Sequence, residues 1–190
     1  MVDRLNVVVA SLMAVGVLAG CAVNGGVVNV GPGMPGFRVE FNRVAGSGTI
    51  PTSVIGNPFS VDKSDFDAAV ADAVYGQYIG PLARFDTSYD PLIKTDGRIV
   101  FWFDPEFDSS LNAICGDPAS LGHAPSPGHI SMAMAFCIGE RSMVQFAGTL
   151  EGAEGPTAPA FRQMLSSTTH YLTAIRDPMM DGDRCSGLDC

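Results

Sequence analysis

Carboxylates are the residues of this chain whose spacing most suggests chemistry. Six acidic residues form two groups, one within a loop and one directly after an apolar run: Asp86, Asp90 and Asp96, then Asp104, Glu106 and Asp108. Clustered carboxylates bind cations such as Ca²⁺, or serve as acid and base on a glycosidic bond. The local sequences SYDP, TDG and FDPEFD are nevertheless typical of turns in which aspartate bonds its own backbone. We therefore expect no metal and no cofactor, with Asp104, Glu106 and Asp108 as the candidate ligands if a cation binds.

Histidine and serine chemistry is poorly supported by the sequence. His123, His129 and His170 have no carboxylate or cysteine partner at ligand spacing, no Gly-x-Ser-x-Gly motif occurs, and no cysteine pair has zinc-site spacing. The segment around Cys185 (RCSGL) resembles the nucleophile segment of papain-like cell-wall endopeptidases. In that family a histidine follows the cysteine, whereas here every histidine precedes Cys185. The chain is therefore not expected to be an enzyme.

Gly31, Gly33 and Gly36 match the G-x-G-x-x-G pattern of dinucleotide-binding turns. Prolines occupy two of the variable positions, and the residues that follow, FRVEF, alternate like a strand where bound pyrophosphate needs a helix N-terminus. We interpret residues 22–36 as a flexible Gly/Pro/Asn-rich spacer and expect no nucleotide there.

An uncharged apolar run from Leu5 to Ala19 has the proportions of a signal peptide and is short for a transmembrane helix. It leads into Leu18-Ala19-Gly20-Cys21, which resembles the lipobox of bacterial lipoproteins. The resemblance implies cleavage before Cys21, a diacylglyceryl thioether on its sulfur and, as a rule, a further acyl chain such as palmitate on its amino group. At about 0.8 kcal/mol per buried methylene, two or three chains give a stable membrane anchor.

The residue after Cys21 bears on sorting in the lipoproteins of Gram-negative bacteria, where aspartate favours the inner membrane. Ala22 therefore implies the outer membrane, with the domain facing the periplasm. An ordinary cleaved secretory signal and an uncleaved anchor helix are the alternatives, because Asp3 offsets Arg4 ahead of the apolar run.

Four cysteines remain after Cys21, an even number that favours disulfides in an exported domain. Three pairings are possible. We favour Cys115 with Cys137, where a strand cysteine would fasten the loop leading into it, and Cys185 with Cys190 as a small ring in the C-terminal tail.

The composition is that of one acidic domain. The chain has 190 residues, 20 acidic against 11 basic, and a net charge of −9. Scattered basic residues in so acidic a protein argue against nucleic acid as a partner and against charge-driven binding to anionic lipids. We assign residues 1–20 to the signal peptide, 21–36 to the lipidated tether and 37–190 to a single domain.

Hydrophobic periodicity predicts a first strand at 47–55 and a helix after Gly56-Asn57-Pro58-Phe59. Ser64 is the expected N-cap of that helix, and an apolar face from Phe66 to Tyr78 supports it. Residues 98–103 are apolar on both faces, as in a central strand.

Residues 129–138 and 143–150 alternate and flank a short turn, which predicts an antiparallel hairpin with one face of small residues. A second helix is expected from Pro159 until Asp177-Pro178. The order strand, helix, strand, hairpin, helix predicts an α+β domain, with a small, mainly antiparallel sheet and two helices packed on it.

The layout resembles small uncharacterised Gram-negative lipoproteins, through Gly56–Phe59 and Ala135-Phe136-Cys137. We expect a non-catalytic structural or assembly accessory that binds an envelope protein. The alternatives are a periplasmic module for a small ligand or cation, and a hydrolase.

Overall fold

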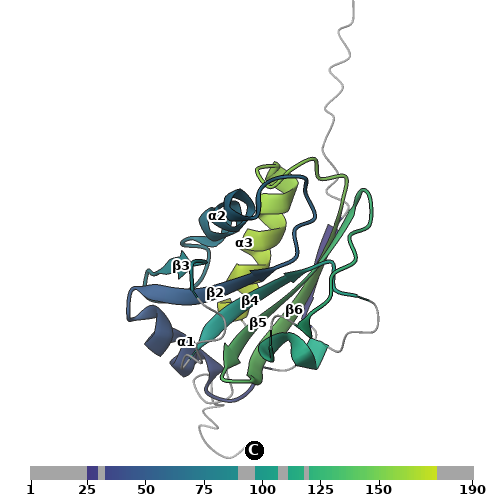
Figure 1. The fold of residues 1–190 in the computed structure, drawn as a ribbon. Helices are drawn as coiled ribbons and strands as arrows, with labels where there is room; N and C mark the ends of the chain where they lie inside the picture. The colour runs from purple at the N-terminus through teal and green to yellow at the C-terminus, as the bar shows by residue number, and fades with distance from the viewer. Residues whose placement is uncertain (1–24, 30–32, 90–96, 107–110, 118–119, 175–190) are drawn as a thin grey trace, which may run out of the picture.

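The computed structural model describes residues 25–29, 33–89, 97–106, 111–117 and 120–174, which fold around one six-stranded sheet (Figure 1). Its strand order is β1-β6-β5-β4-β2-β3. In chain order the elements are β1 Gly25–Asn29, α1 Phe37–Ala45, β2 Thr49–Ile55, α2 Lys63–Val74, β3 Arg84–Asp86, β4 Arg98–Phe103, the 3₁₀ helix η1 Leu111–Cys115, β5 His129–Ile138, β6 Arg141–Glu151 and α3 Pro159–Ala174. The α+β prediction is confirmed, but α1 adds a third helix.

The sheet is mixed. Strand β2 runs parallel to both β3 and β4, while the β4–β5, β5–β6 and β6–β1 pairs are antiparallel. Helix α2 accounts for the parallel β2–β3 pair, because it returns the chain along the sheet before β3 enters in the direction of β2. The expected hairpin is present as β5 and β6.

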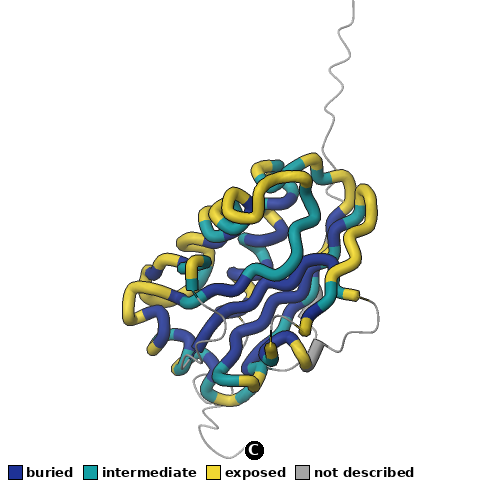
Figure 2. Tube along the Cα trace, in the orientation of Figure 1, coloured by how far each residue is buried: buried dark blue, intermediate teal, exposed yellow. Residues whose placement is uncertain are grey.

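Strand β4 lies between β2 and β5, and all six of its residues are buried (Figure 2). One face of the sheet carries α1, α2 and α3 over a core of large side chains. Phe66 of α2 lies at its centre, with ring centroids 5.0 Å from Phe103, 6.0 Å from Phe59 and 6.0 Å from Phe161. The predicted role of 98–103 as a central strand is therefore confirmed.

Residues 37–45 form helix α1, so the prediction of a strand at FRVEF was wrong. Phe37, Phe41, Val44 and Ala45 are buried, a helical spacing that extends beyond the five residues that alternate. Val39, which a strand would have placed beside the two phenylalanines, is 47% exposed. Burial of one helical face decided between the two periodicities.

Strand β1 lies inside the stretch 21–36 that we assigned to a flexible tether. Residues 25–29 pair with Phe146–Leu150 of β6, so this part of the stretch belongs to the sheet. Backbone hydrogen bonding to the edge of a formed sheet can order a glycine-rich segment that has little strand propensity of its own.

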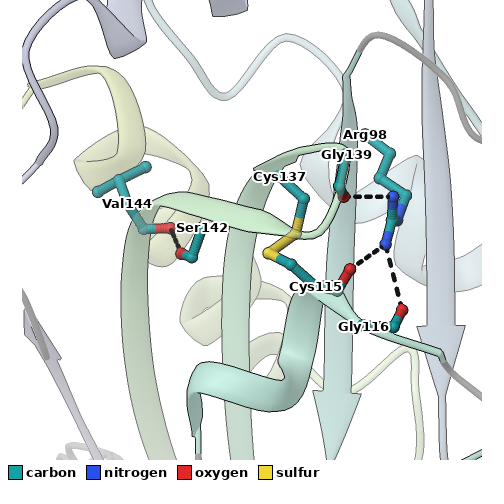
Figure 3. The surroundings of a disulfide bond; sticks show 7 residues. All are labelled: Arg98, Cys115, Gly116, Cys137, Gly139, Ser142 and Val144. Atoms are coloured by element: carbon teal, nitrogen blue, oxygen red, sulfur yellow. Dashed lines mark hydrogen bonds between the residues drawn. A yellow bond between two sulfur atoms is a disulfide. The ribbon is translucent and has the colours of Figure 1, made fainter.

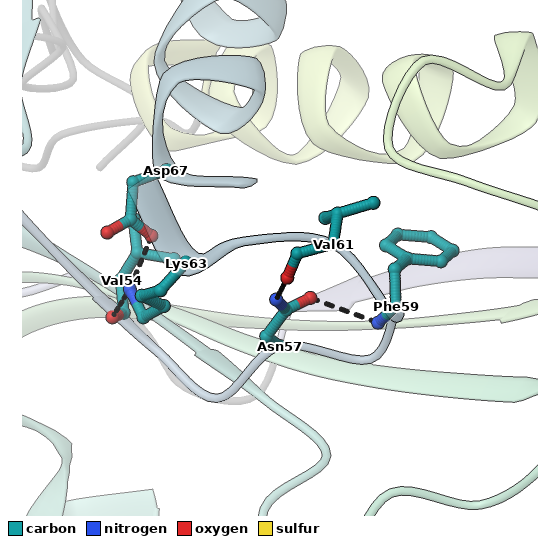
Figure 4. A network of polar contacts seen from close by, with 6 residues as sticks. All are labelled: Val54, Asn57, Phe59, Val61, Lys63 and Asp67. Atoms are coloured by element: carbon teal, nitrogen blue, oxygen red, sulfur yellow. Dashed lines mark hydrogen bonds and ion pairs between the residues drawn. The ribbon is translucent and has the colours of Figure 1, made fainter. Parts of the chain in front are cut away.

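The turn between β2 and α2 is fixed by polar contacts (Figure 4). The Asn57 amide group donates to the Val61 carbonyl at 2.8 Å, and its oxygen accepts from the Phe59 N–H at 3.0 Å. Lys63 donates to the Val54 carbonyl at 2.8 Å and forms an ion pair with Asp67. The helix begins at Lys63 with Asp62 as the N-cap residue, so Ser64 is not its cap.

Helix α3 begins at Pro159, as predicted, and buries Phe161, Leu165, Thr168 and Leu172. Its expected end at Asp177-Pro178 lies outside the described residues. No helix in the described part of the chain combines the length and apolar character needed to span a bilayer.

Candidate functional site

The sheet face opposite the helices is closed by a disulfide between Cys115 and Cys137 (Figure 3). Cys115 ends η1 and Cys137 lies near the end of β5, and both are fully buried. The small side chains of Ala133 and Ala135 let η1 pack directly on the strand. The predicted Cys115–Cys137 disulfide is confirmed, whereas Cys21, Cys185 and Cys190 lie outside the described residues.

Arg98 fastens the same segment from the other side. Its guanidinium donates to the carbonyls of Cys115 at 2.5 Å, Gly116 at 3.3 Å and Gly139 at 2.9 Å, so that β4, η1 and the β5–β6 turn meet at one side chain. Arg98 is only 4% exposed. Burial lowers the pKa of the guanidinium, and the neighbouring Tyr89 and Glu140 act in the opposite direction.

Asp104 forms a tight turn at the end of β4. It is the non-glycine residue with a left-handed backbone among those described, at φ 46°, and it is 3% exposed. Its Oδ1 accepts from the Ser131 N–H at 2.8 Å, and its own N–H donates to the Ser131 carbonyl at 2.8 Å. Burial raises the pKa of the Asp104 carboxyl, while the Ser131 hydrogen bonds and His129 and His123 lower it. Through these hydrogen bonds Asp104 connects the end of β4 to β5.

The candidate cation ligands do not form a site within the described residues. Asp104 is buried in its turn, Glu106 is exposed beside Gly122, and Asp108 lies outside the described part. No group of three or more histidine, cysteine or acidic side chains is placed to hold a metal ion in the ranges that the structure covers.

Asp86 is the described member of the other acidic group. This carboxylate accepts from the N–H and the hydroxyl of Ser88 at 3.0 and 2.6 Å, so it is bonded within its own turn. Asp90 and Asp96 lie outside the described residues.

The G-x-G-x-x-G pattern of Gly31, Gly33 and Gly36 is followed by a helix, although we expected a strand there and rejected nucleotide binding partly for that reason. Helix α1 begins directly after Gly36. A dinucleotide fold would also need parallel strands on either side of this helix. Here β1 is antiparallel to β6 at one edge of the sheet, and β6, β5 and β4 lie between β1 and β2. This topology does not fit a dinucleotide-binding unit.

The strands give the domain two distinct ends. At one end β1 begins at Gly25, β5 begins at His129, and β2, β4 and β6 finish. We call this the Gly25 end. Helices α2 and α3 both start there and run to the other end, where the Ile79 N–H donates to the Thr173 hydroxyl at 2.8 Å. We call that the Ile79 end.

Four exposed apolar side chains belong to segments at the Ile79 end. The loop after α2 presents Tyr75, Ile79 and Leu82, which are 45, 52 and 65% exposed, and α3 presents Tyr171 at 50%. We call these four residues, which share this end of the fold, the apolar patch. Beside it lies an open hollow of about 330 Å³ whose lining residues are Gln77, Ser166, Ser167, His170 and Tyr171.

Arg98 and the apolar patch were not among the residues predicted from the sequence. Arg98 is the first residue of a strand that is apolar on both faces, so the sequence could have indicated a buried arginine. Such an arginine is almost always paired, which would have predicted hydrogen-bond partners for it. The sequence did not indicate the patch, because its loop residues and Tyr171 of α3 are far apart in the chain and share one end only in the fold.

No known family and no curated protein matches the sequence. Among solved structures the chain is similar to two crystal forms of the PelC dodecamer from Paraburkholderia phytofirmans, one of them a point variant. Identity is 11% for the variant and 12% for the other, each at a TM-score of 0.42 over 80% of this chain and 99% of that chain.

Proposed function

We propose that this chain is an exported lipoprotein, anchored through lipid on Cys21, whose domain is a non-catalytic accessory of the cell envelope. The outer membrane, with the domain in the periplasm, is the location that Ala22 favours. The domain would bind an envelope protein through the apolar patch.

The observation that carries this proposal is the buried disulfide downstream of Leu18–Cys21. Cys115 and Cys137 are joined at a Cα–Cα distance of 5.6 Å, within the usual range for such bonds. Structural disulfides of this kind persist in oxidising compartments such as the periplasm and are rare in the cytosol. A lipobox and a disulfide-bonded domain are independent features that favour the same export route.

The apolar patch supports a protein partner. Isolated apolar residues on a surface are ordinary, but the four that share the Ile79 end include Tyr171, which also lines the hollow. Tyrosine is also enriched where proteins bind one another, because its ring buries a large area and its hydroxyl stays hydrated. Tyr75 and Tyr171 provide two such side chains within the patch.

Site-specific photocrosslinking in membranes tests the partner. A photoreactive amino acid replaces Leu82 or Tyr171 in the patch, or Val61 as the matched control. Val61 is also an exposed apolar residue, at 39%, but it lies at the Gly25 end. We expect one adduct of the same mass from positions 82 and 171 and none from 61. Equal labelling from all three positions, or none from the patch, contradicts the proposal.

The patch and the anchor can be tested separately. Leu82→Asp should remove the adduct formed from position 171 while the protein stays in the membrane fraction. Cys21→Ser should abolish both lipid labelling and cleavage before residue 21, so that the unlipidated precursor keeps its apolar segment from Leu5 to Ala19. A Cys21→Ser variant that is still lipidated and cut before residue 21 contradicts the lipid anchor.

A further inference from the structure

We infer that the Gly25 end of the domain is held against the lipid headgroups, so that the Ile79 end points away from the membrane. This inference rests on the proposed lipidation of Cys21. It adds a fixed orientation to a domain that the sequence alone would place on a long, flexible tether.

The position of strand β1 carries the inference. β1 begins at Gly25 and is paired to β6 from its first residue, Gly25 opposite Leu150. Only residues 22–24 therefore separate a lipidated Cys21 from the sheet. Four Cα steps span at most about 14 Å even when fully extended. The first residue of β1 must then lie within about that distance of the anchored cysteine.

The position of Gly25 at one end of the sheet determines which end is close to the anchor. The turns that follow β2, β4 and β6 and the turn that precedes β5 lie at the same end as Gly25. The longest of these strands, β5 and β6, run from this end to the turn at Gly139 and Glu140. Ten residues at 3.3 Å each place that turn roughly 30 Å further along the sheet. The connection is thus shorter than the domain that it holds.

The surface chemistry of the two ends agrees with this orientation. The turn before β5, residues 123–128, is exposed and contains two prolines, a serine and a glycine. Glu151, the last residue of β6, and Glu154, on the turn after it, are also exposed. These residues suit the hydrated headgroup layer and are unsuited to insertion into hydrocarbon. The apolar patch, in contrast, lies at the far end, where it would be accessible to a protein partner.

The acidic residues also define the kind of lipid surface. Glu106, Glu151 and Glu154 are exposed at the Gly25 end, and the cations Lys63 and Arg162, in the first turns of α2 and α3, are each paired with an aspartate. Zwitterionic headgroups fit this end better than anionic ones, which would repel it. The inferred contact is therefore close apposition to phosphatidylethanolamine- or phosphatidylcholine-like headgroups.

Fluorescence quenching by headgroup-labelled lipid tests the inference. The full lipoprotein is purified from membranes and reconstituted into phosphatidylcholine vesicles that contain a short-range headgroup quencher. A genetically encoded fluorescent amino acid replaces Ser126 at the Gly25 end or Arg141 at the opposite turn, both exposed positions. We expect severalfold stronger quenching at position 126 than at position 141.

A matched variant separates orientation from mere attachment. A Gly/Ser insertion of roughly 15 residues between Asn24 and Gly25, with a root-mean-square span of about 20 Å, should bring the two quenching values together. Equal quenching without the insertion, or stronger quenching at 141, overturns the orientation alone. Intact mass measured on the same samples reports the lipid, and an unmodified Cys21 overturns the anchoring and the orientation together.

Discussion

The two faces of the sheet are closed by different means. On the helix face, α1, α2 and α3 pack large rings such as Phe66, Phe103 and Phe161 into one continuous core. On the other face, small side chains lie under the short η1, which is held by the Cys115–Cys137 bond and by Arg98. Burial of apolar side chains is the main closure of the helix face, whereas the other face also has a bond that persists only under oxidising conditions.

The largest effect should come from the helix face. Phe66→Ala removes a fully buried ring that contacts three other rings, and it should lower the free energy of unfolding by about 4 kcal/mol. Urea denaturation of the domain measures this change. Val39→Ala, at a half-exposed position of α1, is the control and should cost less than about 0.5 kcal/mol. Similar costs for both variants would refute the assigned core.

Loss of the disulfide should have the next largest effect. The bond joins residues 22 positions apart, so replacing Cys115 and Cys137 by alanine should lower the free energy of unfolding by roughly 3 kcal/mol. The paired variant Cys185→Ala, Cys190→Ala is the control: if these cysteines form the predicted ring, its loss should cost less, because that ring closes a shorter loop. An unchanged urea midpoint in the Cys115/Cys137 variant would show that this face does not need oxidation.

Arg98 should contribute less than the disulfide but be coupled to it. Arg98→Met leaves three backbone carbonyls without their donor and should cost about 2 kcal/mol. Arg98→Lys should recover part of this loss. In the variant that lacks the disulfide, Arg98→Met should cost less, because both groups hold the same segment. Strict additivity of the two losses is the result that contradicts a shared role.

The smallest expected effect concerns the pH dependence of Asp104. Burial raises the pKa of this carboxyl above 3.8, so the folded state binds the proton more tightly than the unfolded state. Its contribution to stability is then greatest below about pH 4 and is lost as the pH rises through the raised pKa. The stability of the wild type relative to Asp104→Asn should fall over this range. A relative stability that increases with pH would instead indicate a lowered pKa.

Much of the sheet could be predicted because its strands carry strong local patterns. Residues 98–103 are apolar on both faces, and 129–138 alternate large with small side chains, so their burial follows from sequence alone. Helix α1 could not be separated from a strand, since Phe37 and Phe41 fit both periods and Val39 between them fits that of a strand. Strand β1 was hidden because Gly25–Asn29 acquires its structure from pairing with β6.

The candidate site was less predictable than the fold. The disulfide partners followed from the strand position of Cys137 and the loop before it. The role of Asp104 could not be predicted in this way. The nearby acids Glu106 and Asp108 suggested a cation site, whereas in the structure the Asp104 carboxylate accepts a hydrogen bond from Ser131. The apolar patch depends on contacts between segments far apart in the chain, such as Ile79 with Thr173.

The proposed function depends most on Cys21, which we expect to be the lipidated first residue of the mature protein. Mass spectrometry of the N-terminal peptide from membrane-purified protein tests it directly. We predict a peptide that begins at Cys21 and carries a diacylglyceryl group on sulfur together with an acyl chain on the amino group. A mature protein that begins at another residue, or one whose Cys21 carries no lipid, contradicts the account.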